Sequence, residues 1–122
     1  MMAISPSDIL NLADWLYGFS GTYNPEEVLL RAVIGRYYYA VFHKAKIKLE
    51  ARGIKIPRAG SEVHQIVIEE LKKIDRWLGD AVYQLRRARN KADYDLNQNF
   101  NRAYVNSLIY IAIDVWKELD TL

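Results

Sequence analysis

The most constraining feature of this sequence is the spacing of its apolar residues, which recur at every third or fourth position along nearly the whole chain. This period matches one face of an α-helix, whereas a half-buried strand would alternate apolar and polar residues. The longest such segment starts at Asn24 and Pro25 and meets no stop signal before Gly53. A helix of about 28 residues would be roughly 42 Å long. The sequence therefore predicts an all-α protein with one long central helix.

Start and stop signals divide the rest of the chain. Ser5 followed by Pro6 predicts a short first helix that ends near Gly18. Its expected inward residues are Ile9, Leu12, Ala13 and Leu16. In the long helix, Asn24 is the expected cap, and the expected core stripe is Leu30, Ile34, Tyr37, Val41, Ala45 and Leu49.

A loop over residues 53–60 is predicted from its glycines and Pro57. Ser61 is expected to cap a third helix that ends before Gly79, and a fourth helix is expected over residues 80–93. Asn97 or Asn99 is expected to open the last helix, whose apolar stripe is Phe100, Tyr104, Leu108, Ile111, Val115 and Leu119. The expected fold is an antiparallel up-and-down bundle of four main helices plus a short N-terminal helix, with residues 1–122 in a single domain.

Composition excludes several classes of small protein. The chain has 122 residues and no cysteine, which rules out a disulfide framework, a zinc knuckle and a thiol nucleophile. It has no basic-then-apolar leader and no run of about 18 apolar residues, so a cytoplasmic protein that does not enter a membrane is expected. The formal net charge of +2 is too small to indicate nucleic-acid binding by itself.

The common catalytic signatures are missing from the sequence. There is no glycine-rich phosphate loop, no HExxH, no Gly-x-Ser-x-Gly and no cluster of acids at metal-ligand spacing. We therefore expect no metal site and no cofactor, and a metal-dependent or nucleotide-hydrolysing enzyme is disfavoured.

Arg89 interrupts the apolar period of the fourth helix. The stripe through Leu78, Val82 and Leu85 assigns position 89 to the core or to an interface, and a permanently charged guanidinium there needs a partner. One interpretation pairs Arg89 with Asp93 one turn later, and an exposed pair of that kind contributes only about 0.2 to 0.5 kcal/mol. The other places Arg89 in a groove where it meets an anion such as a phosphate.

Basic residues are concentrated around Arg89. The segment Arg86-Arg87-Ala88-Arg89-Asn90-Lys91 has four basic residues in six, a pattern that is usually a solvated face. Arg102 follows downstream, and Tyr94 adds an aromatic ring beside the run. Positive charge next to a stacking ring is the combination that binds single-stranded nucleic acid. Nucleic-acid contacts are therefore predicted for Arg86, Arg87, Lys91, Arg36 and Arg102.

The long helix supplies a second polar set. Arg36, Tyr39 and His43 are spaced by three and four residues, so they share one face and could line the same groove as Arg89. His43 is either a satisfied packing residue or a proton-transfer group. His64 lies in the first turn of the third helix, where burial or capping explains it as well as catalysis would, and no role is assigned to it.

Two blocks of the sequence resemble the HEPN domain family of prokaryotes. These are RYYYAVFH, at residues 36–43, and RNKADY, at residues 89–94, which occur in the order and at the separation typical of that family. The Gly/Pro loop and Ser61-Glu62-Val63-His64 that lie between them are part of the same resemblance. The resemblance covers almost the whole chain. It implies an all-helical domain that forms a homodimer through a two-fold interface. Many members are metal-independent endoribonucleases, often toxins encoded beside a minimal nucleotidyltransferase that acts as antitoxin.

The resemblance also implies site residues. The family motif is an arginine, a polar residue and a histidine four to six residues later, which maps onto Arg89 and Asn90 but places Tyr94 where the histidine would be. A tyrosine phenol ionises near pH 10, so it is a much weaker base at neutral pH than an imidazole. His43 is the compensating candidate for the base. Some partner enzymes add AMP to a tyrosine two residues after the histidine, a position that is Leu96 here.

Three functional hypotheses follow. The first is a toxin-like homodimer that binds RNA and cleaves it without a metal, with Arg89, Asn90, Tyr94 and His43 as the catalytic candidates. The second is a non-catalytic module that binds a minimal nucleotidyltransferase and its nucleotide. In the third, Arg89 only pairs with Asp93 inside an ordinary helical dimer.

Overall fold

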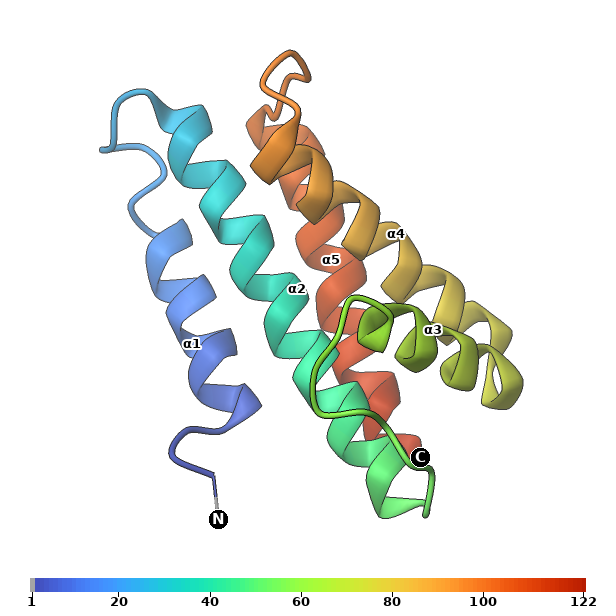
Figure 1. Cartoon of the computed structure of the whole chain (residues 1–122). Coiled ribbons are helices and arrows are strands. Elements are labelled where there is room, and N and C mark those ends of the chain that lie inside the picture. The colour runs from blue at the N-terminus through green and yellow to red at the C-terminus, as the bar shows by residue number, and fades with distance from the viewer. Residues whose placement is uncertain (1) are drawn as a thin grey trace.

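The computed structural model describes residues 2–122, and this part of the chain is helical without strands (Figure 1). A short 3-10 turn, η1 (Leu119–Thr121), closes the chain. The five helices are α1 (Pro6–Tyr17), α2 (Glu26–Ala51), α3 (Val63–Ile74), α4 (Arg76–Tyr94) and α5 (Arg102–Glu118). The predicted all-α bundle with a short N-terminal helix is therefore confirmed.

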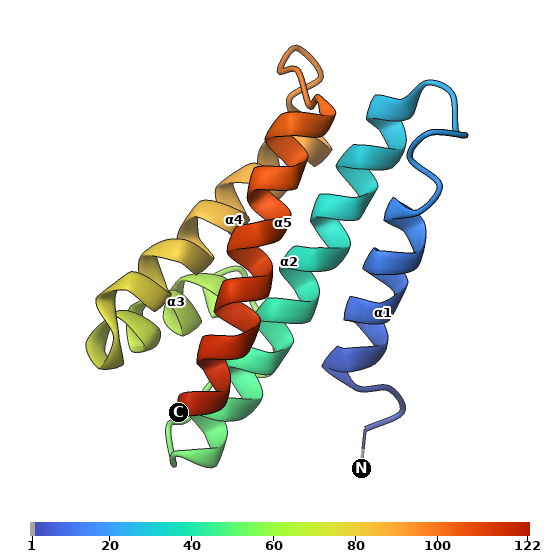
Figure 2. The same ribbon diagram turned by 180° about the vertical axis from the view of Figure 1, so that it is seen from behind.

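The long helix α2 is the centre of the bundle, since it contacts each of the other four helices. α1 runs antiparallel to α2 on one side, and α4 runs antiparallel to α2 and α5 on the other (Figure 1). α2 and α5 therefore run in the same direction, as the reverse view also shows (Figure 2). α3 has 12 residues, the same length as α1, and packs against α4. No helix in residues 2–122 is both long enough and apolar enough to cross a bilayer.

The core lies between α2 and the helices around it. All six predicted stripe residues of α2 are buried, and so are residues such as Val33, Tyr38 and Phe42 on its other faces. In α1 only Ala13 is fully buried, whereas the predicted core residue Leu12 is 44% exposed. The reason is that α1 packs mainly against α2, with a single hydrogen bond from Tyr17 to Asn106 of α5, so only a narrow stripe of α1 is covered.

Helix starts agree with the sequence pattern at α1 and differ elsewhere. Ser5 and Asp8 form the capping box of α1. Pro25, not Asn24, occupies the N-cap position of α2, and no side chain caps it. Ser61 does not cap α3, whose N-cap position is Glu62. Asn101, not Asn97 or Asn99, caps α5 through its side chain.

α4 begins four residues earlier than predicted. The side chain of Asp75 accepts a hydrogen bond from the backbone N–H of Leu78 at 3.3 Å, which caps the helix ahead of Gly79. Gly79 therefore lies inside α4 instead of ending α3. A Cβ at this position would lie 2.3 Å from Cγ and 2.8 Å from the backbone N of Lys72. The glycine is required because α3 and α4 approach each other closely here.

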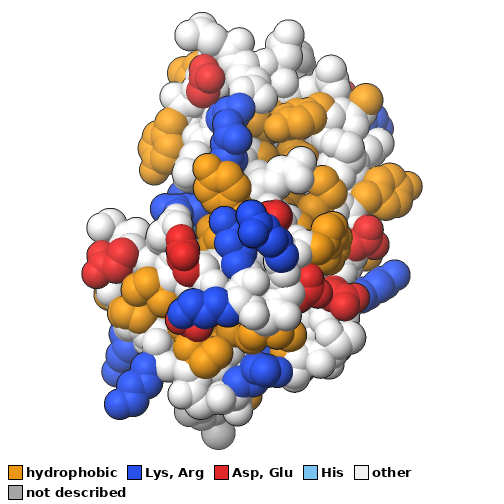
Figure 3. Space-filling view, turned by 90° about the vertical axis from the view of Figure 1, so that its right-hand side faces the viewer, with side chains coloured by type: hydrophobic (Ala, Val, Ile, Leu, Met, Phe, Trp, Pro, Cys, Tyr) orange, Lys and Arg blue, Asp and Glu red, His pale blue; other side chains and the backbone are white. Residues whose placement is uncertain are grey.

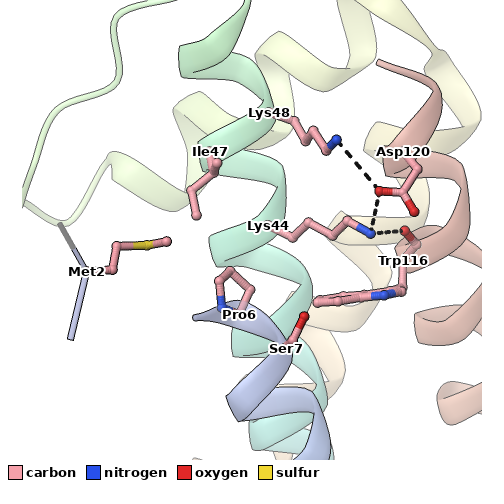
Figure 4. A pocket seen from close by; sticks show the side chains of 8 residues that line it. All are labelled: Met2, Pro6, Ser7, Lys44, Ile47, Lys48, Trp116 and Asp120. Carbon is pink, nitrogen blue, oxygen red and sulfur yellow. Dashed lines mark hydrogen bonds and ion pairs between the residues drawn. The ribbon is translucent and has the colours of Figure 1, made fainter. Parts of the chain in front are cut away.

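The C-terminal end of the chain is fixed to α2 by charged side chains (Figure 4). Nζ of Lys44 lies 2.9 Å from Oδ1 of Asp120, donates to the backbone carbonyl of Trp116 at 2.7 Å, and sits 4.1 Å from the centroid of the Trp116 ring. Lys48 adds a second, longer contact to Asp120 at 3.6 Å. Lys44 lowers the pKa of the Asp120 carboxyl by hydrogen bonding to it.

Candidate nucleic-acid interface

The ring of Tyr39 is the centre of a cluster of basic and aromatic side chains where α2, α3 and α4 meet. The guanidinium carbon of Arg89 lies 5.0 Å from the Tyr39 ring centroid, and that of Arg36 lies 5.4 Å from it. Both distances permit a favourable cation–π interaction. The histidine rings contact the same tyrosine, His64 edge-on at 6.1 Å and His43 stacked at 6.2 Å. We call this group the Tyr39 cluster and define it as Arg36, Tyr38, Tyr39, His43, His64, Arg86 and Arg89.

Arg89 is largely enclosed in the Tyr39 cluster, with a side chain that is 19% exposed. Its Nε lies 2.9 Å from Oδ2 of Asp93, but the N–H is not directed at that oxygen, so the buried Nε donates no hydrogen bond. Nη1 donates to Oδ1 of Asn90 at 3.1 Å. The ring of Tyr94 lies 5.9 Å from the guanidinium carbon. The predicted Arg89–Asp93 pair is thus present, but it leaves a buried donor of Arg89 unused.

The other two arginines of the cluster carry charge that no described carboxylate neutralises. Arg36 and Arg86 form no ion pair with any residue of the 2–122 range, and Arg86 has only a long contact of 3.5 Å to Oε1 of Gln65. Of the three arginines, only Arg89 therefore pairs with a carboxylate, that of Asp93. Like charges gathered in this way disfavour one another, and a bound anion relieves the repulsion.

The two histidines of the cluster are held differently. Nδ1 of His64 lies 2.6 Å from the Tyr38 hydroxyl, and its ring stacks on Phe42 with centroids 4.3 Å apart. Burial lowers the pKa of His64, and the positive charges of Arg86 and Arg89 lower it further. His43 is exposed and has no contact with Arg89 beyond the shared Tyr39 ring. Burial and then Lys46 lower the pKa of His43.

The basic run of α4 is divided between two faces of the helix. Arg86 and Arg89 face α2 and α3, while Arg87 and Lys91 line a shallow hollow together with Tyr83 and Tyr104, toward α5. Arg102 joins neither group, because its guanidinium pairs with Glu26 of α2 at 2.8 Å. On the face that α3 and α4 turn outward, Lys and Arg side chains gather near the middle and are interspersed with hydrophobic ones (Figure 3).

The predicted catalytic candidates are not all brought together. Arg89 and Asn90 are in direct contact, and Tyr94 lies beside them at the end of α4 with 77% of its side chain exposed. His43 contacts the Tyr39 ring, as Arg89 does, but makes no direct contact with this group. Among residues 2–122 there is no group of three or more His, Cys, Asp or Glu side chains placed to hold a metal ion.

Arg31, which the sequence pattern did not single out, fixes the end of α4 that carries Arg89. Its side chain is buried, and its Nη1 donates to the backbone carbonyls of Ala92 and Asp95 at 2.9 Å each. A second donor, Nη2, bonds the carbonyl of Gln98. These carbonyls would otherwise lack partners at the helix end. The one sequence signal for this role is Glu27, four residues before Arg31, which pairs with it at 3.2 Å.

The contact between His64 and Tyr38 was also not predicted from the sequence. Tyr38 lies between two other tyrosines in RYYYAVFH, and its ring is completely buried. The sequence holds no spacing that connects position 38 to position 64, since the loop between their helices has no regular geometry. The only sequence signal for this contact was the position of His64, in the first turn of a helix that follows such a loop.

Comparison of the chain with protein-family models, with curated proteins and with solved structures gave no match in any of the three. The resemblance to HEPN domains therefore rests on the sequence blocks, and the Tyr39 cluster is the feature of the fold that points to a function.

Proposed function

We propose that this chain is a HEPN-type, toxin-like protein that binds RNA in the cytoplasm and cleaves it without a metal ion. The observation that carries the proposal is the charge imbalance of the Tyr39 cluster, in which only Arg89, of its three arginines, has a carboxylate partner within residues 2–122. A phosphate of the RNA backbone supplies the missing negative charge. Guanidinium groups suit this ligand because they bind phosphate oxygens through two parallel hydrogen bonds.

The proposed cleavage is an internal transesterification. The 2′-oxygen of the RNA loses its proton and forms a bond to the adjacent phosphorus, while the bond from phosphorus to the 5′-oxygen breaks and that oxygen takes up a proton. The products are a 2′,3′-cyclic phosphate and a 5′-hydroxyl. Arg89 stabilises the charge that develops on the phosphate, with Asn90 next to it. Tyr94 and His43 are the proposed proton carriers.

The proposal includes a homodimer, as the HEPN resemblance implies. A two-fold axis beside α4 would bring two copies of Arg89 to one groove. Sedimentation equilibrium of the purified protein measures the mass directly. A dimer is expected, and a monomer at all concentrations would contradict this part of the proposal.

The function is tested by incubating the purified protein in EDTA with a pool of end-labelled RNA. We expect cleavage that leaves cyclic phosphate ends and that is lost in Arg89→Ala. Arg87→Ala is the matched control, since it removes the same charge from the opposite face of α4. His43→Ala shows whether that side chain carries a proton. Cleavage that survives in Arg89→Ala, with both variants folded by circular dichroism, would contradict the proposal.

A second candidate function is a non-catalytic module that binds a minimal nucleotidyltransferase. It is favoured by an apolar surface on α1 and the segment after it, where Trp15 is 62%, Phe19 43% and Tyr23 53% exposed. Exposed aromatic patches of this kind are common at protein interfaces. This candidate predicts that the wild-type protein neither cuts nor binds RNA and co-purifies with the product of a neighbouring gene. RNA cleavage by the isolated protein would exclude it.

A further inference from the structure

We propose that His64, oriented by Tyr38, joins Arg86 and Arg89 to form the phosphate-binding site of the Tyr39 cluster, and that His64 takes up a proton when the phosphate binds. This inference rests on the proposed RNA-binding function. It adds a phosphate-contacting side chain, His64, to which the sequence pattern assigned no role. His64 lies outside both RYYYAVFH and RNKADY. Tyr38 acts as a positioning residue, because its hydroxyl touches only the imidazole.

The contact between Tyr38 and His64 fixes which ring nitrogen carries the proton. The Tyr38 side chain is completely buried and its hydroxyl has no hydrogen-bond partner within residues 2–122 other than Nδ1 of His64, at 2.6 Å. A buried hydroxyl that does not donate is costly, so the Tyr38 O–H donates to Nδ1. Burial raises the pKa of Tyr38, so the phenol keeps its proton. Nδ1 is thus the acceptor, and the neutral imidazole carries its hydrogen on Nε2.

Nε2 of His64 is available for a ligand. No described residue hydrogen-bonds this nitrogen, and it is not among the fully buried polar atoms left without a partner, so it keeps some exposure to solvent. Stacking on Phe42 holds one face of the ring, and the edge-on contact with Tyr39 holds its orientation. An N–H donor on a ring fixed from two sides is suited to one oxygen of a phosphate.

Arg86 and Arg89 lie on the same side of α4, one turn apart, and both face this histidine. Arg86 reaches Gln65, the residue next to His64, and Arg89 lies over the Tyr39 ring that His64 also touches. The charged and titratable groups that face His64 are therefore Arg86 and Arg89 from α4, and Tyr38, Tyr39 and His43 from α2. None of them is a carboxylate.

This environment makes the proton on His64 dependent on a bound anion. With the site empty, burial and the two arginines keep the pKa of His64 below its ordinary value, so the ring is neutral at pH 7. A phosphate between the arginines cancels their charge and places a negative group beside the ring. Both changes favour the imidazolium, which donates from Nε2 to the phosphate. Its second proton, on Nδ1, is donated to the Tyr38 oxygen, so the phenol O–H loses its acceptor, and this cost offsets part of the gain from the phosphate.

The test follows the histidine ring signals by NMR during a pH titration of the full chain. The protein is titrated alone, with a 2′-O-methyl RNA oligonucleotide that cannot be cleaved, and with inorganic phosphate. We expect the RNA to raise the pKa of His64 by about one unit or more, as an opposite charge at contact distance does. His43 is a proposed proton carrier and its charge also acts on His64, so its titration is recorded but the control is the Arg89→Ala variant. In Arg89→Ala the effect of RNA on His64 should disappear.

A second measurement tests the role of Tyr38. The ¹⁵N shifts of the His64 ring report the tautomer, and we expect a strong preference for the proton on Nε2 in the wild type that is lost in Tyr38→Phe. Tyr39→Phe keeps a comparable ring and removes a different hydroxyl, so it should leave the tautomer unchanged. A wild-type His64 with its proton on Nδ1 would overturn the positioning role.

The outcomes separate this inference from the proposed function. If RNA binds, as judged by fluorescence anisotropy, while the titration of His64 does not move, the role of His64 is wrong and RNA binding stands. If inorganic phosphate raises the pKa of His64 but RNA does not bind, the phosphate site stands and the RNA function fails. If neither probe moves His64, the inference is overturned.

Discussion

The Tyr39 cluster combines arginines, histidines and tyrosines, and these side chains are held by different contacts. Arg89 is anchored on one side by Asp93 and Asn90, while its buried Nε makes no hydrogen bond. An unsatisfied buried donor costs about 1 to 3 kcal/mol, and the Asp93 oxygen 2.9 Å away offsets part of that cost. A ligand is indicated instead by Arg36 and Arg86, which have no carboxylate partner within residues 2–122.

The histidines of the cluster make stability depend on pH. The pKa of His64 is lowered in the folded protein from its ordinary 6.5, mainly by burial, so the unfolded chain binds more protons below pH 6.5. Above that pH both states are neutral at this site and its contribution is constant. As the pH falls from 6.5 toward the folded pKa, stability decreases. His43 acts in the same direction.

We therefore expect wild-type stability to fall between pH 7 and about pH 5.5, and to fall less in His64→Gln. Urea unfolding followed by circular dichroism at the two pH values provides the comparison. The lowered pKa of Asp120 also contributes to stability. That contribution is lost only at lower pH, because the ordinary pKa of the group is 3.8. An equal loss of stability in wild type and His64→Gln would show that His64 is not the titrating group.

At the scale of the helices, two glycines have opposite surroundings. Gly35 lies inside α2, and a Cβ there would meet nothing within 4 Å. Gly79 lies inside α4, and a Cβ there would overlap Lys72 and approach the carbonyl oxygen of Ile68 at 3.0 Å. The same residue type is thus a local weakness in one helix and a packing requirement in the other.

These surroundings predict opposite effects of one substitution. Gly35→Ala should raise the free energy of unfolding by about 0.5 to 1 kcal/mol, since alanine loses less conformational entropy in a helix. Gly79→Ala should lower it by about 1 to 3 kcal/mol, because α3 and α4 must separate to admit the methyl group. Each variant serves as the control for the other in urea unfolding, and a gain in stability from Gly79→Ala would refute the close approach of these helices.

Arg31 stabilises the junction between α4 and α5 by hydrogen bonding to backbone carbonyls at the end of α4. Arg31→Ala should cost about 3 kcal/mol of stability, because several carbonyls lose a charged donor at once. Arg52→Ala, at the exposed end of α2, should change stability by less than about 0.5 kcal/mol. Thermal or urea unfolding measures the stability of both variants. If Arg31→Ala lowers stability as little as Arg52→Ala does, water replaces the guanidinium at these carbonyls.

For the whole molecule, the arrangement of charge matters more than its sum. The formal net charge is only +2, yet Arg36, Arg86 and Arg89 meet at one place while Lys44, Lys48 and Arg102 are paired with carboxylates elsewhere. An RNA strand would therefore be attracted to the face that α2, α3 and α4 share, and a uniformly basic surface is not needed.

This arrangement predicts a modest salt dependence of RNA binding. If the three positive charges of these arginines replace about three counterions of the RNA backbone, the logarithm of the binding constant should fall with the logarithm of salt concentration with a slope of about −2 for single-stranded RNA. Arg86→Gln should reduce the slope by about 0.7, whereas Arg87→Gln, on the opposite face of α4, should leave it unchanged. Fluorescence anisotropy over a salt series measures both, and equal slopes in the two variants would argue against the Tyr39 cluster as the contact surface.

The sequence by itself determined the elements that depend on local pattern. The period of three to four, the Ser5 capping box and the stripe of α2 are properties of neighbouring residues, so the all-helical fold could be predicted from them. The shared face of Arg36, Tyr39 and His43 follows from helical spacing in the same way, and so does the pair of Arg89 with Asp93.

Only the tertiary structure decided which distant residues meet. Gly79 is read locally as a helix stop, but it lies inside α4 because the backbone of α3 passes too close for a side chain. The contact of His64 with Tyr38, and the carbonyls that Arg31 binds, join residues separated by loops whose geometry no periodic pattern specifies. The run from Arg86 to Lys91 is continuous in sequence, yet it is split between two faces because neighbouring residues on a helix point in different directions. The candidate phosphate site therefore exists only once α2, α3 and α4 have packed together.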